Sequence, residues 1–432
     1  MFKLKLISPA PRNKYCNKTG RTSFPQLNLR IIEALTPDDF DTEICDERIE
    51  ELNLEDSPDL VGITVMTSVA LRAYEIADSY RSRGIPVILG GIHSSLMSDE
   101  ALDHADSVLI GEGEGVWGKV ISDFRVDSLK RTYAGSEYPM FEKTYPKLRQ
   151  LKKPEAYTIS HTIQTTRGCP FDCEFCSVTN LWGKKYRFRP IEDVIDEMKT
   201  LRYKRIVIVD DNVIGSPKYS KQLFEKMIPL NIRWAGQASI TLASDKHLLS
   251  LLKKSGCEWL FIGIESLSAE NLSEMNKKIN KIETLEDNIR KIKQAGINVM
   301  GSFIFGFDHD DRSVFDEVVN FCVRTKLDAA NFYILTPLPG TTLFERMEKE
   351  GRILTKNWDI YDANHVIFQP KNMDPIELLE GYIDAYKKMY SLGSIFRRVS
   401  GFSSQTLQML GLNLARMKNR GGFSRWSRSE QP

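Results

Sequence analysis

Residues 165–176 read Thr-Thr-Arg-Gly-Cys-Pro-Phe-Asp-Cys-Glu-Phe-Cys and place Cys169, Cys173 and Cys176 on one short loop. Soft thiolate ligands select zinc or the iron of an iron–sulfur cluster. A four-iron cluster normally takes four cysteine ligands, so three would leave one iron open to bind and reduce a small molecule. The spacing therefore points to an enzyme rather than to a simple electron carrier.

Two simpler explanations of these cysteines have to be weighed. His161 could complete a structural zinc site, but such sites usually pair their ligands in two CxxC-type knuckles, and the sequence has no second one. A disulfide is opposed by the odd total of seven cysteines and by residues 1–12, which lack the apolar core of a secretory signal. The spacing favours a cluster, and we expect the remaining cysteines to be small core residues: Cys16, Cys45, Cys257 and Cys322.

Length and composition set broad bounds. The 432 residues are enough for two or three domains, and 41% hydrophobic with 27% charged residues is typical of a globular protein. The net charge of +1 gives no global electrostatic reason to expect a nucleic-acid partner. The apolar runs are shorter than the roughly 18 residues that suggest a membrane span. We therefore expect a cytoplasmic protein with reduced cysteines.

Residues 1–125 alternate short runs rich in Val, Ile and Leu with helical patterns, the clearest at 68–83. Such runs are typical of parallel strands buried on both faces, and their alternation with helices predicts a doubly wound, flavodoxin-like α/β sheet. The expected strands are 3–8, 42–46, 60–65, 86–90 and 107–110. Ligands bind such sheets beyond the carboxyl ends of the strands.

Three loops fall at this edge of the predicted sheet. They are Thr64 to Ser68, Gly90-Gly91-Ile92-His93, and the run from Gly111 to Gly115. Glycine lets a backbone approach a large flat or phosphorylated ligand closely, although any one of these loops could serve only to turn the chain. The candidate ligand-binding residues are Thr64, Ser68, Gly90, Gly91, Gly111 and Glu112.

The motif CxxxCxxC, with Phe175 directly before the last cysteine, resembles that of the radical S-adenosylmethionine (SAM) enzymes. The resemblance implies a [4Fe-4S] cluster held by Cys169, Cys173 and Cys176, with SAM chelating the fourth iron through its amino and carboxylate groups. It also implies that an electron from the cluster cleaves SAM to methionine and a 5′-deoxyadenosyl radical, which abstracts a hydrogen atom. Phe175 then lies beside the cofactors.

Together, the three loops resemble the cobalamin-binding domain attached to many radical SAM enzymes. The usual fingerprint of that domain, DxHxxG, is absent: residues 46–51 after the second strand read Asp-Glu-Arg-Ile-Glu-Glu, and His93 lies in a different loop. The resemblance therefore implies cobalamin without a lower histidine ligand. The alternative is a domain of the same fold that has lost the cofactor and only binds substrate or supports the barrel.

Residues 126–157 contain three prolines and clustered lysines and are interpreted as a linker. From 158 to 350 the alternation resumes, with strands expected at 159–165, 205–209, 232–237, 258–263, 298–305 and 329–334 and helices near 190–202, 217–227, 245–254, 282–295, 311–324 and 341–350. Six such units match the partial (β/α)6 barrel of radical SAM enzymes. The chemistry of such barrels lies at the carboxyl ends of the strands, and the cysteine loop follows the first strand.

Polar residues follow the second and third barrel strands. By position, Asp210, Asp211 and Asn212 replace the Gly-Gly-Glu motif of the family, so the resemblance implies that they hold the amino group of SAM through charge-assisted hydrogen bonds. The alternative is a turn or a helix cap, which Asp and Asn also favour. Gln237 and Ser239 could bind the ribose or the carboxylate of SAM.

The later strands end in further candidates. Glu265, in Phe-Ile-Gly-Ile-Glu-Ser, could bind the ribose, the methionine end of SAM or the substrate. Phe305 lies in a stretch whose apolar residues resemble those that line the adenine. Leu338 begins Leu-Pro-Gly-Thr, which resembles a loop over the pocket in this branch of the family, and proline stiffens such a loop.

Basic and aromatic residues flank the cysteine loop. Arg167 could steady the charge of a cluster or pair at the surface, and the sequence favours neither. Tyr186, Arg187 and Arg189 could contact anionic groups of SAM or substrate, but solvated surface positions are the default expectation.

Residues 351–432 form a smaller, mostly helical third part, with a helical pattern at 374–391. It resembles the C-terminal extension of a subset of cobalamin-type radical SAM proteins that includes the hopanoid methylases. We expect His365 to be a structural or pocket-wall residue rather than a metal ligand. Apolar residues then recur at helical spacing beside basic ones, at Leu407, Leu410, Leu414 and Met417. This fits either peripheral contact with an anionic membrane or a helix packed on the barrel, followed by a disordered basic tail at 421–432.

The sequence thus predicts a radical SAM enzyme of the cobalamin-binding class that methylates an unactivated carbon, one SAM supplying the radical and another methylating cobalamin. The cofactors implied are a [4Fe-4S] cluster, SAM and cobalamin. The expected partners are a small-molecule or lipid-like substrate and an electron donor such as flavodoxin or ferredoxin, without nucleic acid. Two alternatives stay open: radical chemistry without methyl transfer, such as cyclisation, rearrangement or oxidation, and a non-enzymatic iron–sulfur sensor or scaffold.

Overall fold

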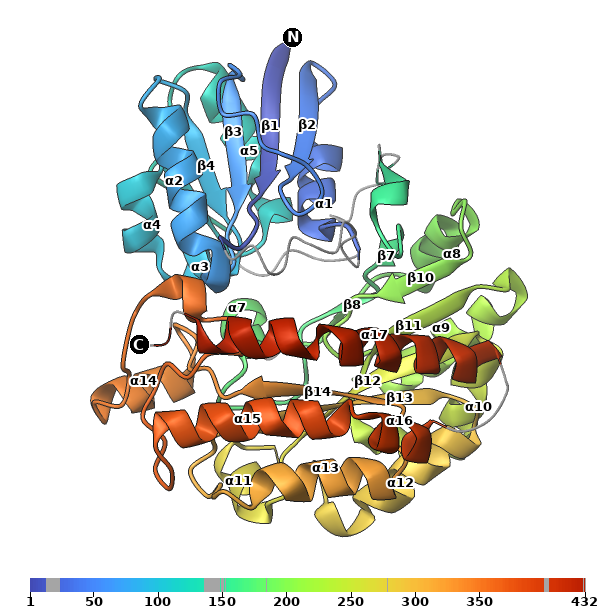
Figure 1. The fold of residues 1–432 in the computed structure, drawn as a ribbon. Coiled ribbons are helices and arrows are strands. Elements are labelled where there is room, and N and C mark those ends of the chain that lie inside the picture. The colour runs from blue at the N-terminus through green and yellow to red at the C-terminus, as the bar shows by residue number, and fades with distance from the viewer. Residues whose placement is uncertain are drawn as a thin grey trace.

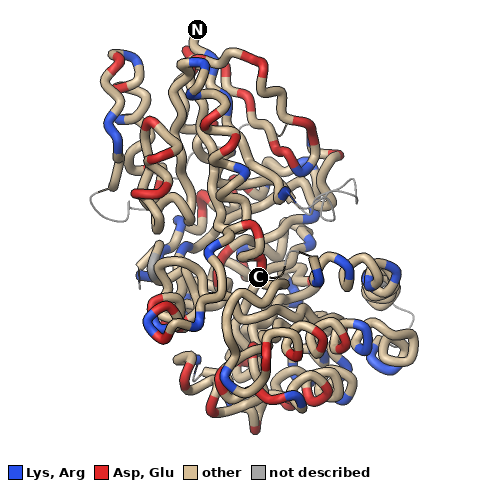
Figure 2. The backbone as a smooth tube through the Cα atoms, turned by 60° about the vertical axis from the view of Figure 1, so that its left-hand side comes forward, with Lys and Arg blue, Asp and Glu red and all other residues tan. Residues whose placement is uncertain are grey.

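The computed structural model describes residues 1–12, 24–135, 148, 151, 153–183, 185–277, 279–399, 404–429 and 431. Within them, the strands form two six-stranded parallel sheets and one small antiparallel pair. Figure 1 shows the first sheet above the second, with the long helix α17 (Ser404–Arg428) running along the lower part. Acidic and basic residues are interspersed over both parts (Figure 2). Cys16, expected to be a core thiol, lies outside the described residues.

The first sheet has the strand order β2-β1-β3-β4-β5-β6, and all neighbouring strands are parallel. Its strands are β1 (Phe2–Ser8), β2 (Phe40–Asp46), β3 (Leu60–Thr64), β4 (Val87–Gly90), β5 (Ser107–Ile110) and β6 (Thr132–Ala134). The order changes direction between β1 and β3, the kind of position at which doubly wound sheets bind ligands. This confirms the flavodoxin-like fold, and β6 extends the sheet beyond residue 125, into the segment interpreted as a linker.

Helices bury both faces of this sheet. Apolar residues of α1 (Leu27–Leu35) and α5 (Trp117–Arg125) pack on one face, and those of α2 (Ala70–Arg81) and α4 (Ser98–His104) pack on the other. The remaining elements are α3 (Ile92–Leu96) and the 3-10 turns η2 (Thr67–Val69) and η3 (Gly113–Gly115). Because both faces are covered, β3 has no polar face and reads as a continuous apolar run.

The second sheet has the order β14-β13-β12-β11-β10-β7 and is also parallel throughout. Its strands are β7 (Thr162–Ile163), β10 (Arg205–Ile208), β11 (Arg233–Ala238), β12 (Cys257–Glu265), β13 (Asn298–Phe305) and β14 (Ala329–Ile334). The helices between and after them are α8 (Ile191–Lys199), α9 (Pro217–Met227), α10 (Lys246–Lys254), α11 (Ala269–Glu274), α12 (Ile282–Gln294), α13 (Val314–Arg324) and α14 (Thr342–Lys349). This confirms the partial (β/α)6 barrel, with β7 and β14 as its two open edges.

The first barrel strand is shorter than the predicted range 159–165. After β7 the chain forms β8 (Thr166–Arg167), which leaves the barrel sheet and pairs antiparallel with β9 (Arg187–Phe188). The cysteine loop and α7 (Ser177–Trp182) lie between β8 and β9. The short turns are η4 (Pro154–Ala156), η5 (Ile228–Leu230) and η6 (Ile240–Ser244).

The C-terminal part covers the open edge of β14. It comprises η7 (Trp358–Ile360), α15 (Pro375–Met389), α16 (Leu392–Arg398) and α17. Side chains from these helices donate to the backbone carbonyls of the edge: Arg416 to Ala330 (2.8 Å), Arg398 to Leu327 (2.9 Å) and Asn413 to Asp328 (2.8 Å). An unpaired strand edge is a template for aggregation, and here side-chain donors close it.

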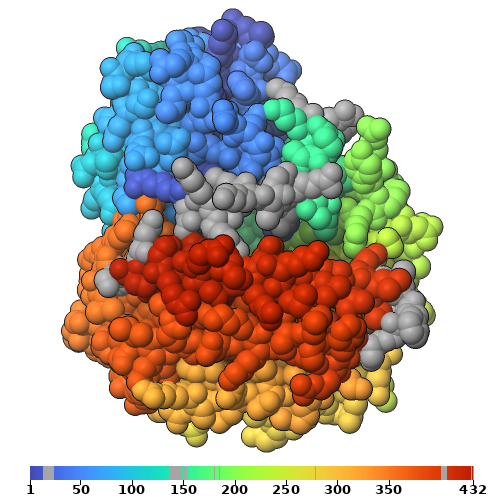
Figure 3. Space-filling view, in the orientation of Figure 1, coloured from blue at the N-terminus to red at the C-terminus, as the bar shows by residue number. Residues whose placement is uncertain are grey.

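Residues 421–432, expected to be a disordered tail, differ in the structure: α17 continues to Arg428. The helix persists because its last turns are packed. Phe423 stacks on Tyr386 with ring centroids 3.9 Å apart, Ser427 is fully buried, and Arg428 pairs with Glu380 at 2.5 Å. Of the two expected placements of this segment, the structure shows the helix packed on the barrel, where it forms a continuous surface (Figure 3). Among the described residues, no helix combines the length and apolarity needed to cross a bilayer.

We expect Arg398→Met to lower the free energy of unfolding by about 2–4 kcal/mol, because it strips donors from buried carbonyls that have no access to water. Arg398 is buried and also bonds Met389 O and Asn413 Oδ1. The matched control is Arg397→Met, since Arg397 is exposed and surface changes usually stay within roughly 0.5 kcal/mol. Chemical denaturation measures both, and equal losses would contradict the edge-capping role.

Candidate functional site

The cysteine loop starts at a tightly bonded corner. Asp210, at the end of β10, is fully buried and accepts hydrogen bonds from the backbone N of Thr165 (2.6 Å) and from the hydroxyls of Thr166 (2.7 Å) and Thr165. Burial raises the pKa of Asp210. Its carboxylate therefore holds the turn from β7 to β8, a position that differs from the expected contact with the amino group of SAM.

Gly168 connects β8 to the first cysteine and has to be glycine. Its φ is +90°, and a Cβ would lie 2.7 Å from the carbonyl oxygen of Lys185. Its backbone N donates to Oδ2 of Asp211 at 3.1 Å. The two aspartates thus hold nearby residues of the same strand-to-loop transition: Asp210 holds Thr165 and Thr166, and Asp211 holds Gly168.

The three thiols are partly buried and free of disulfides. Burial raises the pKa of Cys169, Cys173 and Cys176 to about 11, while the Lys277 ammonium lowers it. Iron or another cation would have to displace these protons. The other side of the loop is anchored through Glu174, whose carboxylate accepts from Arg346 on α14 at 2.8 Å.

Polar groups at the ends of β10 and β11 remain available for a ligand. Burial, together with the nearby Asp210 carboxylate, raises the pKa of Asp211 to about 6, and this carboxylate lines a cavity. The backbone N of Ser239 donates to Oδ1 of Asn212 (3.2 Å), but the buried Nδ2 of Asn212 has no hydrogen-bond partner in the described structure. Gln237 is exposed at the end of β11. An orphaned amide beside a carboxylate fits a polar ligand such as SAM.

Glu265 ends β12 in a left-handed conformation, with φ at +68°, which is uncommon for a residue other than glycine and clusters at functional sites. The hydroxyl of Ser302 donates to Oε2 of Glu265 at 3.2 Å, and Lys277 forms an ion pair with Oε1. The Lys277 ammonium also lies 5.8 Å from the ring centroid of Phe175. Burial lowers and the Glu265 carboxylate raises the pKa of Lys277, with a net upward shift. Lys277 was not predicted from the sequence, because nothing local distinguishes it from neighbouring lysines.

Phe305 lies away from the expected adenine position. It is fully buried and packs on Phe315, Phe332 and Tyr382, outside the barrel sheet. Side chains alternate along a strand, so the neighbouring Ile304 faces the barrel interior. The alternation of side-chain direction along residues 298–305 could have identified Ile304, rather than Phe305, as the residue that faces the barrel interior.

Leu338 packs with the core of the first domain. Gly340, two residues later, has a φ of +73°, and a Cβ there would lie 2.9 Å from Leu96 of α3. The Leu-Pro-Gly-Thr loop therefore docks against the first sheet's domain.

A cavity of about 410 Å³ joins the two sheets at their carboxyl ends. The first domain contributes five of the predicted residues, namely Thr64, Gly90, Gly91, Gly111 and Glu112. The barrel domain contributes Gln164, Arg167, Val178, Leu181, Trp182, Val209 and Asp211. Ser68, in η2, is not among the lining residues, and Met66 lines the cavity from the same loop.

The glycine loop and the apolar lining of this cavity are compatible with part of a large ligand such as cobalamin. A Cβ on Gly111 would meet nothing within 4 Å, so the backbone there is open to a large ligand. An apolar slot runs from the cavity between the first sheet and α1, lined by Leu6, Gly62, Ile88, Leu109, Leu29, Ile32 and Trp117. His93 is turned away from it: its ring nitrogens lie 3.3 Å from Thr67 and 3.4 Å from Glu100.

Arg167 forms ion pairs with carboxylates, which was one of the two roles expected for it, but it does so in the interior rather than at the surface. It binds Glu112 and Glu114 of the first domain, and Arg187 binds the same Glu112. Arg189 is also buried and pairs with Glu197 at 2.7 Å. The arginines expected at the surface are therefore internal.

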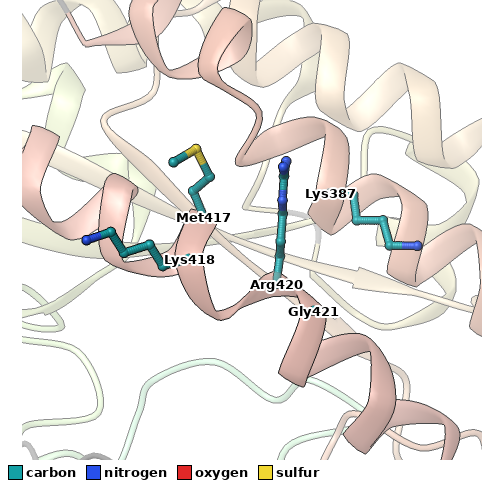
Figure 4. Close-up of a pocket in the computed structure, with 5 residues that line it drawn as sticks. All are labelled: Lys387, Met417, Lys418, Arg420 and Gly421. Carbon is teal, nitrogen blue, oxygen red and sulfur yellow. The ribbon is translucent and has the colours of Figure 1, made fainter.

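The two histidines considered in the sequence lie apart from the cysteines. His161 precedes β7, at the opposite end of that strand from the cysteine loop, and packs on Tyr203 with ring centroids 5.8 Å apart. His365 is buried, its Nδ1–H donates to the Asp362 carboxylate (2.9 Å), and its ring packs edge-on against Trp426. A separate open cavity of about 580 Å³ lies on α15 and α17 and is lined by Lys387, Met417, Lys418, Arg420 and Gly421. Figure 4 shows Arg420 between Lys387 and Lys418, whose side chains extend in opposite directions.

Three family models match the chain: the radical SAM superfamily over residues 163–322, the B12 binding domain over 21–120, and a domain of unknown function, DUF4070, over 341–421. The chain is 34% identical to the bacteriochlorophyllide d C-12(1)-methyltransferase of Chlorobaculum tepidum, over 92% of the chain and 89% of that protein. The bacteriochlorophyllide d C-8(2)-methyltransferase of the same organism is 30% identical, over 83% of the chain and 85% of that protein.

More distant relatives and a solved structure are consistent with these matches. The hopanoid C-2 methylase of Rhodopseudomonas palustris is 25% identical, over 76% of the chain and 65% of that protein. The structure of the radical SAM methyltransferase TsrM from Kitasatospora setae, with cobalamin and a [4Fe-4S] cluster bound, has a TM-score of 0.69 at 16% identity and covers 99% of both chains. At that identity the likeness shows the fold.

A barrel with three thiolates at its mouth, facing a glycine-lined cavity of a flavodoxin-like sheet, defines a radical SAM enzyme with a second cofactor domain. The chain belongs to the cobalamin-dependent radical SAM methyltransferase family, whose cofactors are a [4Fe-4S] cluster, SAM and cobalamin. The family sets aside the zinc-site and sensor alternatives and favours methyl transfer over other radical chemistry.

Replacing Cys173 by alanine should abolish the formation of 5′-deoxyadenosine from SAM and sharply lower the iron content after anaerobic reconstitution, because a cluster cannot be held by two ligands of this loop. The first sheet's domain should stay folded. Cys257→Ala is the matched control, since Cys257 is buried at the start of β12. Full SAM cleavage by Cys173→Ala would contradict the ligand assignment.

Proposed function

We propose that this enzyme methylates an unactivated carbon of a rigid, polycyclic, largely apolar small molecule. The observation that carries the proposal is the single cavity that joins the glycine loops of the first sheet to Asp211 and Trp182 beside the cysteine loop. It would place the cobalamin side of the first sheet directly opposite the barrel residues that follow β7 and β10. The relatives support the substrate class, because bacteriochlorophyllides and hopanoids share a rigid polycyclic skeleton.

Each part of the chain has a separate task in this proposal. Cys169, Cys173 and Cys176 would hold the cluster. Gly111, where a Cβ would meet nothing within 4 Å, would allow the cobalamin macrocycle to approach the backbone, while Gly90 and Gly91 line the same cavity. The bound cofactors supply radical generation and methyl transfer, and the protein supplies binding and orientation. The apolar walls exclude water, which protects reactive species from side reactions.

Lys277 and its neighbours would bind SAM. The carboxylate of SAM would meet the Lys277 ammonium, and its amino group would meet Asp211 or Glu265, through charge-assisted hydrogen bonds. The unpartnered Nδ2 of Asn212 would donate to the same ligand. Gln237, at the end of β11, would reach the ribose.

The remaining expectations concern partners and location. We infer that an external one-electron donor, of the flavodoxin or ferredoxin kind, reduces the cluster in a cytoplasmic setting. If the enzyme meets a membrane-borne substrate, the basic groove around Lys387, Lys418 and Arg420 is the surface whose charge suits anionic lipid headgroups.

Lys277→Met should weaken SAM binding by roughly 10-fold, equivalent to about 1.4 kcal/mol, because it removes the buried ammonium that faces the SAM carboxylate. Lys281→Met is the control, since Lys281 is exposed just before α12. Isothermal titration of the cluster-loaded protein with SAM measures both. An unchanged dissociation constant in Lys277→Met would remove Lys277 from the SAM site.

The reaction is tested by anaerobic reconstitution with SAM and a reductant, with and without hydroxocobalamin, in the presence of chlorophyllide a, a hopene or palmitate. We expect 5′-deoxyadenosine whenever the cluster is reduced, S-adenosylhomocysteine only with cobalamin, and a methylated product from a polycyclic probe only. Formation of S-adenosylhomocysteine without cobalamin, or methylation of palmitate alone, would refute the proposal. Mass spectrometry distinguishes these outcomes.

A further inference from the structure

Four ionised side chains are buried together where the Gly111–Gly115 loop meets the strand pair beside the cysteine loop. Arg167 donates to Oε2 of Glu112 (2.7 Å) and to Oε1 of Glu114 (2.7 Å). Arg187 donates to Oε2 of Glu112 at 2.9 Å and also bonds its other oxygen. The exposed fractions of the side chains are 5% for Arg167, 12% for Arg187, 2% for Glu112 and 6% for Glu114. Among the described residues, the two guanidinium groups and two carboxylates of this network therefore balance in charge at the contact between the two domains.

The network contains two like charges side by side. Arg167 on β8 and Arg187 on β9 are direct cross-strand partners, and like charges in that position repel. Glu112 offsets the repulsion by accepting from both guanidinium groups. A buried ion pair carries a large desolvation cost and is often no more stable than apolar packing. What guanidinium–carboxylate pairs add is fixed direction, since the hydrogen bonds define the relative orientation of the groups.

The network lies between the two cofactor sites. Arg167 is separated from Cys169 by one residue, and Glu112 lines the cavity on the side of the first sheet. The guanidinium carbon of Arg167 also lies 5.3 Å from the ring centroid of Trp182, which lines the same cavity from α7. Any shift of the glycine loop relative to the cysteine loop would have to break or bend these charged hydrogen bonds.

We propose that Arg167, Arg187, Glu112 and Glu114 form a charge-balanced clamp that sets the separation between cobalamin and the cluster-bound SAM. The four are positioning residues, and Arg187 acts through its bonds to Glu112. The inference rests on the proposed function, because it requires both cofactors to be bound. A misplacement of about 1 Å can cost roughly 10²-fold in rate, so loosening the clamp affects transfer between the cofactors more than the binding of either one.

The test uses the full chain, loaded with cluster and cobalamin, as wild type, Arg187→Gln and Arg187→Lys. Arg189→Gln is the matched control, because it removes the charge of another buried arginine, one that bonds Glu197 and the Gln164 carbonyl within the barrel domain. Three quantities are measured: the cobalamin dissociation constant, the enhancement of cob(II)alamin electron-spin relaxation by the reduced cluster, and S-adenosylhomocysteine formed per 5′-deoxyadenosine. The second depends steeply on the distance between the two paramagnets.

For Arg187→Gln we expect iron content and 5′-deoxyadenosine formation within about twofold of wild type, altered spin relaxation, and a fall of roughly 10-fold or more in the product ratio. The spin relaxation and the product ratio of Arg187→Lys should lie between those of wild type and Arg187→Gln. Lysine keeps the positive charge but cannot form the two-pronged hydrogen bonds of a guanidinium group. Arg189→Gln should lower the stability of the protein without changing the cob(II)alamin spin relaxation or the ratio of S-adenosylhomocysteine to 5′-deoxyadenosine. If Arg187→Gln does not fold, Arg187→Lys carries the same comparison.

Two results would overturn the clamp: wild-type spin relaxation and product ratio in the folded Arg187 variants, or equal changes in Arg189→Gln. Failure of the proposed function is a different result. In that case the wild type itself would form no S-adenosylhomocysteine with bound cobalamin, while the relaxation measurement would still report whether Arg187 controls the separation.

Discussion

A carboxylate withdrawn from water needs its hydrogen bonds inside the protein, and Asp210 finds them on Thr165 and Thr166. This bond set ties the end of the second barrel strand to the turn that follows the first. The direction in which the cysteine loop leaves the barrel is therefore decided by a group that cannot move without losing its partners. Gly168, held by Asp211, and the three thiols take their places from this corner.

The two parallel sheets meet at their carboxyl ends, where loops and helix ends of both domains form the cavity wall. The first domain supplies glycines and apolar side chains, and the barrel domain supplies Arg167, Trp182 and Asp211. Neither surface encloses the cavity alone. The buried pairing of Glu112 and Glu114 with two arginines joins the two domains beside this cavity.

The C-terminal helices cover the open edge of the partial barrel at β14. A six-stranded sheet leaves β14 with free carbonyls, and Arg398, Asn413 and Arg416 supply the missing donors from α16 and α17. Because these donors are long side chains on helices, they seal the edge without adding a strand. The same packing explains why a Gly-, Ser- and Arg-rich segment remains helical as far as Arg428. Composition alone had suggested disorder there.

The sequence by itself determined the cysteine loop, both sheet types and the glycine loops, because these depend on local spacing and on periodicity along the chain. It did not determine which candidates face the cofactors. Phe305 packs outward and Asp210 is occupied by threonines, since the orientation of a side chain depends on its neighbours in space. Lys277 and the pairing of Arg167 with Glu112 were decided only by the tertiary structure. Their partners lie 12 and 55 residues away in the chain, and a charge buried by folding carries no local mark of the partner that will balance it.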